Sequence, residues 1–468
     1  MTQLSHDPVP TVDKDTDTHT IARTTASATA APHAVQATHL AEPTRRSLLK
    51  AAGLAVAGTT PFFGPWAHNR VWAQAAQPKP LMIGLTMDAS GQYAASGGME
   101  RLGAMMAIKE FNDKGGVLGR RIEAIHMDTE TTPATGSRVA ERMITRNEVA
   151  FMVGALHSGV ANAISQVAQK YGCIFLNTNS SSPTEAGKDC HRTKFVWDGN
   201  GTNFAHAIVK NAMAVNGKNW VLLTNDYVWG HNTSRATRSI VEANGGKIVE
   251  ELMVPQNTRD FSSYLLKLQQ LKPNVVATAV GGDDIKALRQ QVVQLNLQKS
   301  MAWINNQQDW PDVYGLGPDA IFGVFGTTWY YRLDLPGIKE FVASYQKLFP
   351  GMAIKVPGNV YHNSYMCTRE LLRCVEEAGT TNNIAVIKKL EGRKMSARDR
   401  LQHFDAWMDP VTHQCQQTIY MASYNDQPAE KDDIYKILAR SEPKDVVDTD
   451  AAKMCKLESY DATPSYQQ

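Results

Sequence analysis

The sequence predicts an α/β fold with open, mostly parallel sheets arranged in two units. Three observations support this prediction. Strands and helices alternate with little interruption from about residue 81, helices end at glycines, and the alternation restarts near residue 200. The two units cover roughly residues 80–200 and 200–325. The chain that follows the N-terminal signal described below is also long for a single core, which favours two domains.

The first unit begins with a buried strand at 81–85. A loop of small residues leads to a helix at 99–112, which ends at Lys114-Gly115-Gly116, a glycine stop after a basic last turn. The unit continues with a strand at 121–127, a helix at 133–146, a strand at 149–154, a helix at 158–171 and a strand at 173–177.

The second unit begins with a helix at 202–216, for which Thr202 is the expected N-cap and Asn216-Gly217 the stop. Its further elements are a strand at 220–223, a helix at 231–244, a strand at 248–253, a helix at 261–271 and a strand at 275–280. A helix at 359–378 and two strands at 402–407 and 416–424 follow. The polar tail from about Ser441 is expected to wrap the surface or to fray.

The N-terminal segment has the pattern of a twin-arginine export signal. Arg45 and Arg46 precede Ser47-Leu48-Leu49-Lys50 and a weakly apolar run that reaches Ala67. This run is too short and too polar for an easy membrane span. Cleavage after Ala75, or after Ala73, would release a periplasmic protein; an uncleaved anchor and a later translation start are alternatives. Residues 1–75 are therefore left out of the fold prediction.

Composition and motifs argue against several function classes. The chain has 48 Lys and Arg, 46 Asp and Glu and a net charge of +2, with no basic cluster interleaved with aromatics. Nucleic acid is therefore not expected as a partner. The sequence has neither a Gly-x-Ser-x-Gly elbow nor a phosphate-binding Gly-x-x-x-x-Gly-Lys loop, and its histidines are scattered. We expect no catalytic residue, no cofactor and no metal site; His157 beside Ser158 is a tempting pair, but adjacent residues in such a turn usually point apart.

All six cysteines follow the signal. In an oxidising compartment disulfides are expected, and no Cys-x-x-Cys motif competes with them. Cys173 and Cys190 flank a polar loop and form the best pair, and Cys415 with Cys455 could tie down the tail. Cys367 and Cys374 are seven residues apart on a predicted helix, roughly 10 Å, which is too far for a direct bridge.

Three loops of the first unit carry hydroxyls and free backbone N–H groups where strands end. They are 90–98, 156–159 and 177–183. Ligands of open α/β sheets bind beyond the carboxyl ends of strands, and these groups suit a carboxylate or another small polar group. For any one of these loops alone, plain N-capping is the better explanation. Three such loops at equivalent strand ends favour a site.

Three loops of the second unit, 225–230, 281–284 and 305–310, bring aromatic and carboxylate groups to strand ends. Trp229, Asp283 and Asp284 suit a ligand with an apolar side chain and a cationic or donor group. Capped turns for the two aspartates, and core packing for Trp229 and Trp310, are the alternatives.

The sequence resembles periplasmic substrate-binding proteins of ABC importers, of the branched-chain amino acid type (type I). The strongest part of the resemblance is the turn Asn112-Asp113-Lys114-Gly115-Gly116-Val117-Leu118-Gly119. The loops at Ser158 and at 179–181 match at the right separation, and the resemblance covers about 79–424. It implies two doubly wound lobes joined by a hinge of three crossovers, with the ligand cleft between them. It also implies the divisions 76–200 plus 327–400 for lobe 1, 201–326 plus 401–440 for lobe 2, and a tail at 441–468.

The resemblance also implies the ligand contacts. Ser158 and the 179–181 loop would bind a carboxylate, Trp229 would cover the ligand, and a first-loop contact falls near Ser96. The acidic residue for an amino group should lie near Asn306 or Gln307, neither of which is acidic, so Asp283 or Asp284 would replace it. The implied binding residues are Ser96, Ser158, Asn179, Ser180, Ser181, Trp229, Asp283, Asp284 and Asn306.

The predicted function is therefore extracytoplasmic solute binding. A small polar metabolite, an amino acid or a related carboxylate or amide, would be delivered to the permease subunits of an ABC importer in the inner membrane. The protein is expected to be a monomer. A sensor or regulatory module with the same fold is the alternative, followed by an exported enzyme.

Overall fold

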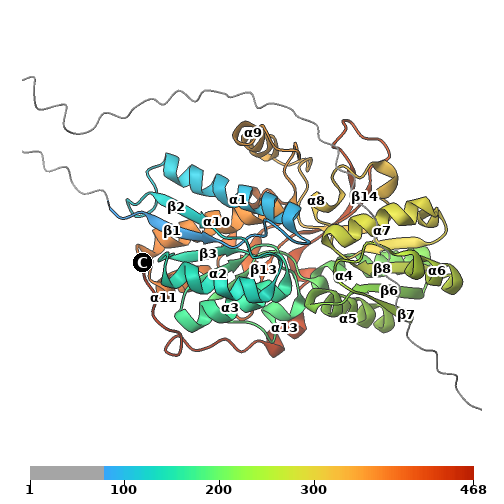
Figure 1. The fold of residues 1–468 in the computed structure, drawn as a ribbon, viewed down its shortest axis with the longest axis horizontal. Helices are drawn as coiled ribbons and strands as arrows, with labels where there is room; N and C mark the ends of the chain where they lie inside the picture. The colour runs from blue at the N-terminus through green and yellow to red at the C-terminus, as the bar shows by residue number, and fades with distance from the viewer. Residues whose placement is uncertain (1–77) are drawn as a thin grey trace, which may run out of the picture. The chain divides into compact units, whose positions relative to one another are not determined.

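Residues 78–468 of the computed structural model form two α/β lobes, each built on its own sheet (Figure 1). The predicted export signal lies outside these described residues. Within 78–468, no helix is both long and apolar enough to cross a membrane.

The first lobe is a parallel sheet with strand order β2-β1-β3-β4-β5. Every residue of β3 and β4 is buried, as expected for a parallel sheet covered on both faces. Helices α1, α10 and α11 pack on one face, and α2 and α3 on the other (Figure 1). The elements are β1 (Leu81–Leu85), α1 (Ala94–Asp113), β2 (Ile122–His126), α2 (Pro133–Thr145), β3 (Phe151–Gly154), α3 (Ser158–Tyr171), β4 (Ile174–Asn177), β5 (Lys194–Val196), α10 (Asn359–Ala378) and α11 (Asn383–Leu390).

The second lobe is a sheet with strand order β15-β14-β10-β9-β8-β6-β7. Its strands are parallel except β14 and β15, which are antiparallel to their neighbours. Helices α4 and α5 cover one face, and α6 and α7 the other. The elements are α4 (Gly201–Asn216), β6 (Asn219–Asn225), α5 (Val228–Ala243), β7 (Lys247–Val254), α6 (Ser262–Leu271), β8 (Val275–Ala279), α7 (Gly282–Gln294), β9 (Ala302–Asn305), α8 (Trp310–Val313), β10 (Val324–Thr327), β14 (Ile419–Tyr424) and β15 (Tyr435–Ser441).

The chain passes between the two sheets three times: after β5, after β10 and before β14. A small antiparallel sheet, β11-β12-β13, lies in the segment before the last crossover. Its residues Ala406 and Cys415 belong to the core of the first lobe, although the predicted division assigns them to the second. The remaining elements are α9 (Ile338–Leu348), β11 (Lys394–Met395), α12 (Ala397–Arg400), β12 (Ala406–Met408), β13 (Cys415–Gln416) and α13 (Thr449–Met454).

Helices α1, α4 and α5 all start earlier than the sequence predicts. Helix α1 begins five residues upstream, at Ala94, so Ser96 is helical rather than in a loop. Helix α4 is capped by Asn200 and not by Thr202. The side-chain oxygen of Asn200 accepts hydrogen bonds from the backbone N–H of Thr202 and of Asn203, which places Thr202 inside the first turn.

The C-terminal tail packs against the first lobe. Arg120 donates to the carbonyl of Gln468 (2.8 Å), and the backbone N–H of Asn383 donates to the carbonyl of Tyr466 (2.9 Å). Residues after β15, which belongs to the second sheet, thus lie on the lobe of the first sheet.

Both predicted disulfides are wrong, because the structure joins Cys190 to Cys455. Cys173 directly precedes β4 and lies in the core beneath α2 and α3, away from the loop that carries Cys190. Cys415, on β13, is buried in the core of the first lobe. The two cysteines that lie near the surface therefore pair with each other, across a sequence separation of 265 residues.

Candidate ligand-binding cleft

A narrow cavity lies where the carboxyl ends of the strands of both sheets meet. Its volume is ≈ 20 Å³, little more than a water molecule needs. Each of the six loops predicted to follow strand ends contributes at least one residue to its lining. The lining residues are Tyr93, Leu156, Asn179 and Ser181 from the first lobe and Tyr227, Trp229, Gly281, Gln307, Asp309 and Asp312 from the second.

Two glycines bring the helices that carry the aromatic residues close to the preceding strands. A Cβ atom on Gly97 would lie 2.1 Å from the carbonyl oxygen of Asp88, and one on Gly230 would lie 2.0 Å from that of Asn225. Only glycine permits these contacts, so α1 and α5 both start directly against the strand ends. Tyr93 precedes α1 and Tyr227 precedes α5, and their hydroxyl oxygens meet across the cavity at 2.6 Å.

Further polar contacts hold the lobes together around the cavity. The side-chain amide of Gln92 donates to Asp284 Oδ2 and to the carbonyl of Gly281, both at 3.1 Å. The hydroxyl of Ser181 donates to the side-chain carbonyl of Gln307. The ring of His157 stacks on that of Tyr227 at 4.6 Å. The two lobes are therefore closed on each other, which explains the small volume of the cavity.

Two buried carboxylates face this cavity. Asp309 accepts from Asn359 (2.7 Å) and Gln307 (3.3 Å) through Oδ1, and Asp312 accepts from the backbone N–H of Gly282 (3.1 Å) through Oδ2. Burial raises the pKa of Asp309 to about 6, against the hydrogen bonds from Asn359 and Gln307. Burial, and then the charge of Asp309, raise the pKa of Asp312 to about 7.

A network of amides and acids lies directly behind the cavity. Asn179 donates to Glu100 (3.2 Å) and to the carbonyl of Val360 (3.1 Å), and Gln307 donates to Asp198 (2.8 Å). Burial raises the pKa values of Glu100 and Asp198 well above the ordinary range. Their role is to hold the amides in place.

The residues predicted from the sequence fall into two groups. Asn179, Ser181 and Trp229 line the cavity. Ser180 is turned away and donates its hydroxyl to Glu185, and Asn306 donates to Thr237 (2.7 Å). Ser96 and Ser158 do not line the cavity; their hydroxyls are buried and, within residues 78–468, have no hydrogen-bond partner.

The two candidate aspartates of α7 occupy different places. Asp283 is half-exposed and pairs with Arg259 (3.3 Å) and Lys286 (3.1 Å) at the surface. Asp284 is fully buried and accepts from Asn225 and from the backbone N–H of Asn257, both at 3.1 Å, beside Gln92. Neither lines the cavity. The acidic group near Gln307 is instead Asp309, two residues further along the same loop.

The structure gives no nucleophile pair at His157 and Ser158. Nδ1 of His157 accepts from the backbone N–H of Val160 (3.4 Å), and burial lowers the pKa of His157 to about 4. The imidazole serves as the N-cap of α3 and as the partner of Tyr227. Within the described part of the chain, no group of three or more His, Cys, Asp or Glu side chains is arranged to hold a metal ion.

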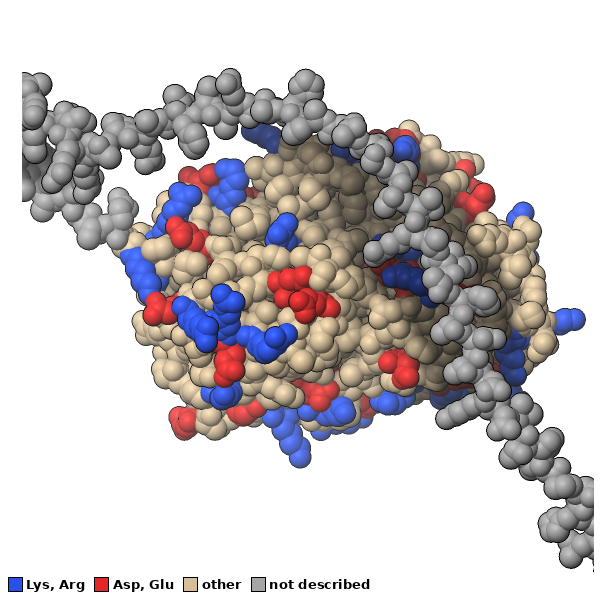
Figure 2. All heavy atoms as spheres, viewed as in Figure 1, with Lys and Arg blue, Asp and Glu red and all other residues tan. Residues whose placement is uncertain are grey.

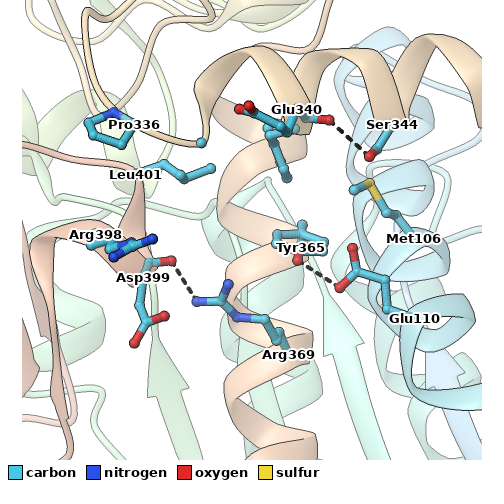
Figure 3. A pocket seen from close by; sticks show the side chains of 12 residues that line it. Met106, Glu110, Pro336, Glu340, Ser344, Tyr365, Arg369, Arg398, Asp399 and Leu401 are labelled. Atoms are coloured by element: carbon cyan, nitrogen blue, oxygen red, sulfur yellow. Dashed lines mark hydrogen bonds between the residues drawn. The ribbon is translucent and has the colours of Figure 1, made fainter. Parts of the chain in front are cut away.

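A larger hollow, ≈ 320 Å³, lies on the surface between α1, α9, α10 and α12 (Figure 3). Its polar groups mostly bind each other: Tyr365 donates to Glu110 (2.8 Å), Arg369 to the carbonyl of Asp399 (2.7 Å) and Ser344 to the carbonyl of Glu340 (2.9 Å) (Figure 3). None of the strand-end loops reaches it. We therefore take the cavity between the sheets, although smaller, as the candidate site.

The outer surface differs from the cavity in charge. Basic and acidic side chains are interspersed over the face shown in Figure 2. Among the residues that the structure describes, neither Lys nor Arg lines the cavity, whereas two carboxylates do.

Comparison with known proteins extends these observations. The model of a family described as periplasmic binding protein matches residues 80–429. The Leu/Ile/Val-binding protein BraC3 of Rhizobium johnstonii is 23% identical over 337 residues, which are 69% of this chain and 84% of that protein.

Solved structures share the fold. A periplasmic binding protein from Burkholderia mallei superimposes with a TM-score of 0.75 at 23% identity, covering 81% of this chain and 99% of that one. The solute-binding protein of an ABC transporter from Rhodopseudomonas palustris, in complex with 3,4-dihydroxybenzoic acid, has a TM-score of 0.70 at 21% identity and covers 78% and 98%.

Proposed function

The chain belongs to the periplasmic binding protein family, and we propose that it binds a small polar metabolite and delivers it to an ABC-type importer in the membrane. Binding, not catalysis, is the role that the site serves. The twin-arginine pattern at Arg45 and Arg46, which lies outside the described residues, supports export to the periplasm.

One observation carries this proposal: both lobes build the same cavity. Tyr93, Asn179 and Ser181 come from the first lobe, and Tyr227, Trp229 and Asp309 from the second. A solute held by both sets stabilises the closed arrangement, and opening of the lobes about the three crossovers releases it. Such a protein needs differential contacts worth only a few kcal/mol between its open and closed states.

The solute class follows from the groups that line the cavity. Amide, hydroxyl and carboxylate side chains beside three aromatic rings suit a small molecule with a polar end and an apolar part. An amino acid or a related metabolite fits this description. The name of the relative from Rhizobium, a Leu/Ile/Val-binding protein, likewise indicates an amino acid. We propose Asn179, Ser181 and Trp229 as direct contacts, together with Tyr93, Tyr227, Gln307 and Asp309. The other predicted residues reach the solute only if the lobes rearrange.

A thermal-shift screen of the purified protein tests the function. Amino acids, amines, amides, urea and carboxylates form the panel, and a solute that binds only the native state raises the melting temperature. Calorimetry with the best compound then compares Ser181→Ala with Ser344→Ala. Loss of the Ser181 hydroxyl should weaken binding by about 1–3 kcal/mol, while Ser344, in the surface hollow, should have no effect. The reverse result would move the site to that hollow.

A further inference from the structure

The charge inside the cavity has one sign only. Asp309 and Asp312 are 7% and 4% exposed, and each has one carboxylate oxygen that accepts no hydrogen bond from the described residues. Lys286, whose charge lowers the pKa of Asp312, pairs with Asp283 at the surface. The buried Arg289 donates to Gln308 and to two backbone carbonyls. A buried carboxylate without a cation is costly, and a bound cation removes that cost.

The remaining walls also suit a cation. Tyr93, Tyr227 and Trp229 line the cavity together, and aromatic rings attract ammonium and guanidinium groups through their electron-rich faces. The indole N–H of Trp229 is buried and has no acceptor within residues 78–468. This N–H group is a donor, so it suits an acceptor atom of the solute and not the cationic group itself.

Two of the donors that a carboxylate solute would need are already engaged. Asn179 donates to Glu100 and Val360, and Ser181 donates to Gln307. An anionic solute would also lie against two carboxylates in a medium of low dielectric constant, where like charges repel strongly. The cavity therefore discriminates against an isolated carboxylate and in favour of a positive charge.

None of the other titratable groups around the two aspartates forms an ion pair with them within residues 78–468. Burial raises the pKa values of Glu100 and Asp198, behind the cavity, well above the ordinary range. His157 is neutral because burial lowers its pKa to about 4, and burial likewise keeps Tyr93 and Tyr227 protonated. The charges of Lys286 and Asp283, both on α7, act on Asp312, and these two residues form an ion pair with each other.

We propose that the solute is a small organic cation, whose ammonium or amidinium group is received by Asp309 and Asp312 within the wall of Tyr93, Tyr227 and Trp229. This inference rests on the proposed function and narrows it. A positive charge without a matching carboxylate distinguishes such a solute from a neutral amino acid.

A matched series of solutes tests the inference directly. Isoamylamine, leucine and 4-methylpentanoate share one branched apolar part and differ in carrying the ammonium group, both groups or the carboxylate alone. Phenethylamine, phenylalanine and 3-phenylpropionate form a second such series. Calorimetry at pH 8 should give the tightest binding for the amines, with the carboxylates weaker by about 100-fold or more.

Two variants connect the preference to the carboxylates. Asp312→Asn should weaken amine binding by at least about tenfold and raise the melting temperature of the solute-free protein at pH 8, because an uncompensated buried charge is removed. Asp113→Asn, at the exposed end of α1 and paired only with Lys109, is the control and should change neither quantity.

The outcomes separate the two levels of the proposal. If leucine or the carboxylates bind as tightly as the amines, solute binding stands and the cationic class is overturned. A lower melting temperature for solute-free Asp312→Asn at pH 8 would likewise overturn it, since the carboxylate would then have a compensating partner. If no compound of any charge binds, the proposed function fails and this inference fails with it.

Discussion

Carboxylates in two regions of this molecule have opposite surroundings. Where the tail packs on the first lobe, Glu391 forms an ion pair with Arg192, lies 3.0 Å from Nε2 of His413 and accepts from the hydroxyl of Tyr460. Glu458 is matched in the same way by His191 and by the backbone N–H of Arg192. In the cleft, Asp309 and Asp312 accept hydrogen bonds from amide groups, and within residues 78–468 neither forms an ion pair.

The pKa values of these four carboxyl groups shift in opposite directions in the two regions. Burial alone would raise the pKa values of Glu391 and Glu458, but their hydrogen-bonded partners lower both. In the cleft burial dominates, and the pKa values of Asp309 and Asp312 rise to about 6 and about 7. Glu391 and Glu458 are thus held by partners within the chain, whereas Asp309 and Asp312 form no ion pair within residues 78–468.

Removing the tail disulfide should have the largest effect on stability. The bond between Cys190 and Cys455 closes a loop of 265 residues, and loops of this length gain the most from closure. The double variant Cys190→Ser, Cys455→Ser should lose about 4 kcal/mol of unfolding free energy, measured by urea denaturation under oxidising conditions. If its stability equals that of the parent protein, the disulfide does not hold the tail.

Breaking the paired cluster should have the next largest effect. Arg192→Met leaves Glu391 buried with fewer partners, and the expected loss is about 3 kcal/mol. Lys453→Met removes an exposed pair with Asp450 and should cost less than about 0.5 kcal/mol. Equal losses for the two variants would show that burial of the pair is unimportant.

The two regions should also respond to different ranges of pH. Paired carboxylates with lowered pKa values add stability above the pKa of the unfolded chain, and this stability is lost as the pH falls below about 4.5. Unpaired carboxylates with raised pKa values have the opposite effect: the stability of the solute-free protein decreases as the pH rises through 6 and 7. Denaturation measured from pH 4 to 8 should show a decline of at least about 1 kcal/mol above pH 5, reduced in Asp312→Asn. A flat profile above pH 5 would contradict the absence of a cation in the cleft.

The smallest expected effect concerns the contact that closes the cleft. A double-mutant cycle with Tyr93→Phe and Tyr227→Phe isolates the hydrogen bond between their hydroxyls. Its coupling energy should be about 1 kcal/mol in the solute-free protein. No coupling would indicate that the lobes are open in solution.

Much of the fold and the neighbourhood of the site could be predicted from the sequence. Alternating strands and helices, with glycines at helix ends, predicted the parallel sheets, and the carboxyl ends of those strands predicted six loops that all reach the cavity. The periodicity of strands and helices specifies which loops meet, because parallel strands present their carboxyl ends at one edge of a sheet.

The direction of individual side chains could not be predicted. Ser181 faces the cavity while Ser180 faces Glu185, and Asp309 reaches the cavity while Asp283 lies at the surface. Within an irregular loop, neighbouring residues point in directions set by local backbone angles, which carry no periodic signal. The disulfide partners could not be predicted for a related reason. The path of the tail brings Cys190 and Cys455 together, whereas the cysteines nearer to each of them in sequence, Cys173 and Cys415, lie in the core.

The central claim is that the cleft keeps its carboxylates unpaired for a positively charged solute. Its most direct test is the affinity of the purified protein for isoamylamine, measured by calorimetry between pH 5.5 and pH 8. An alkylammonium group remains charged over this range, so only the protein titrates. Affinity should increase at least about tenfold with pH as Asp309 and Asp312 lose their protons. An affinity that stays constant or decreases as the pH rises would contradict the claim.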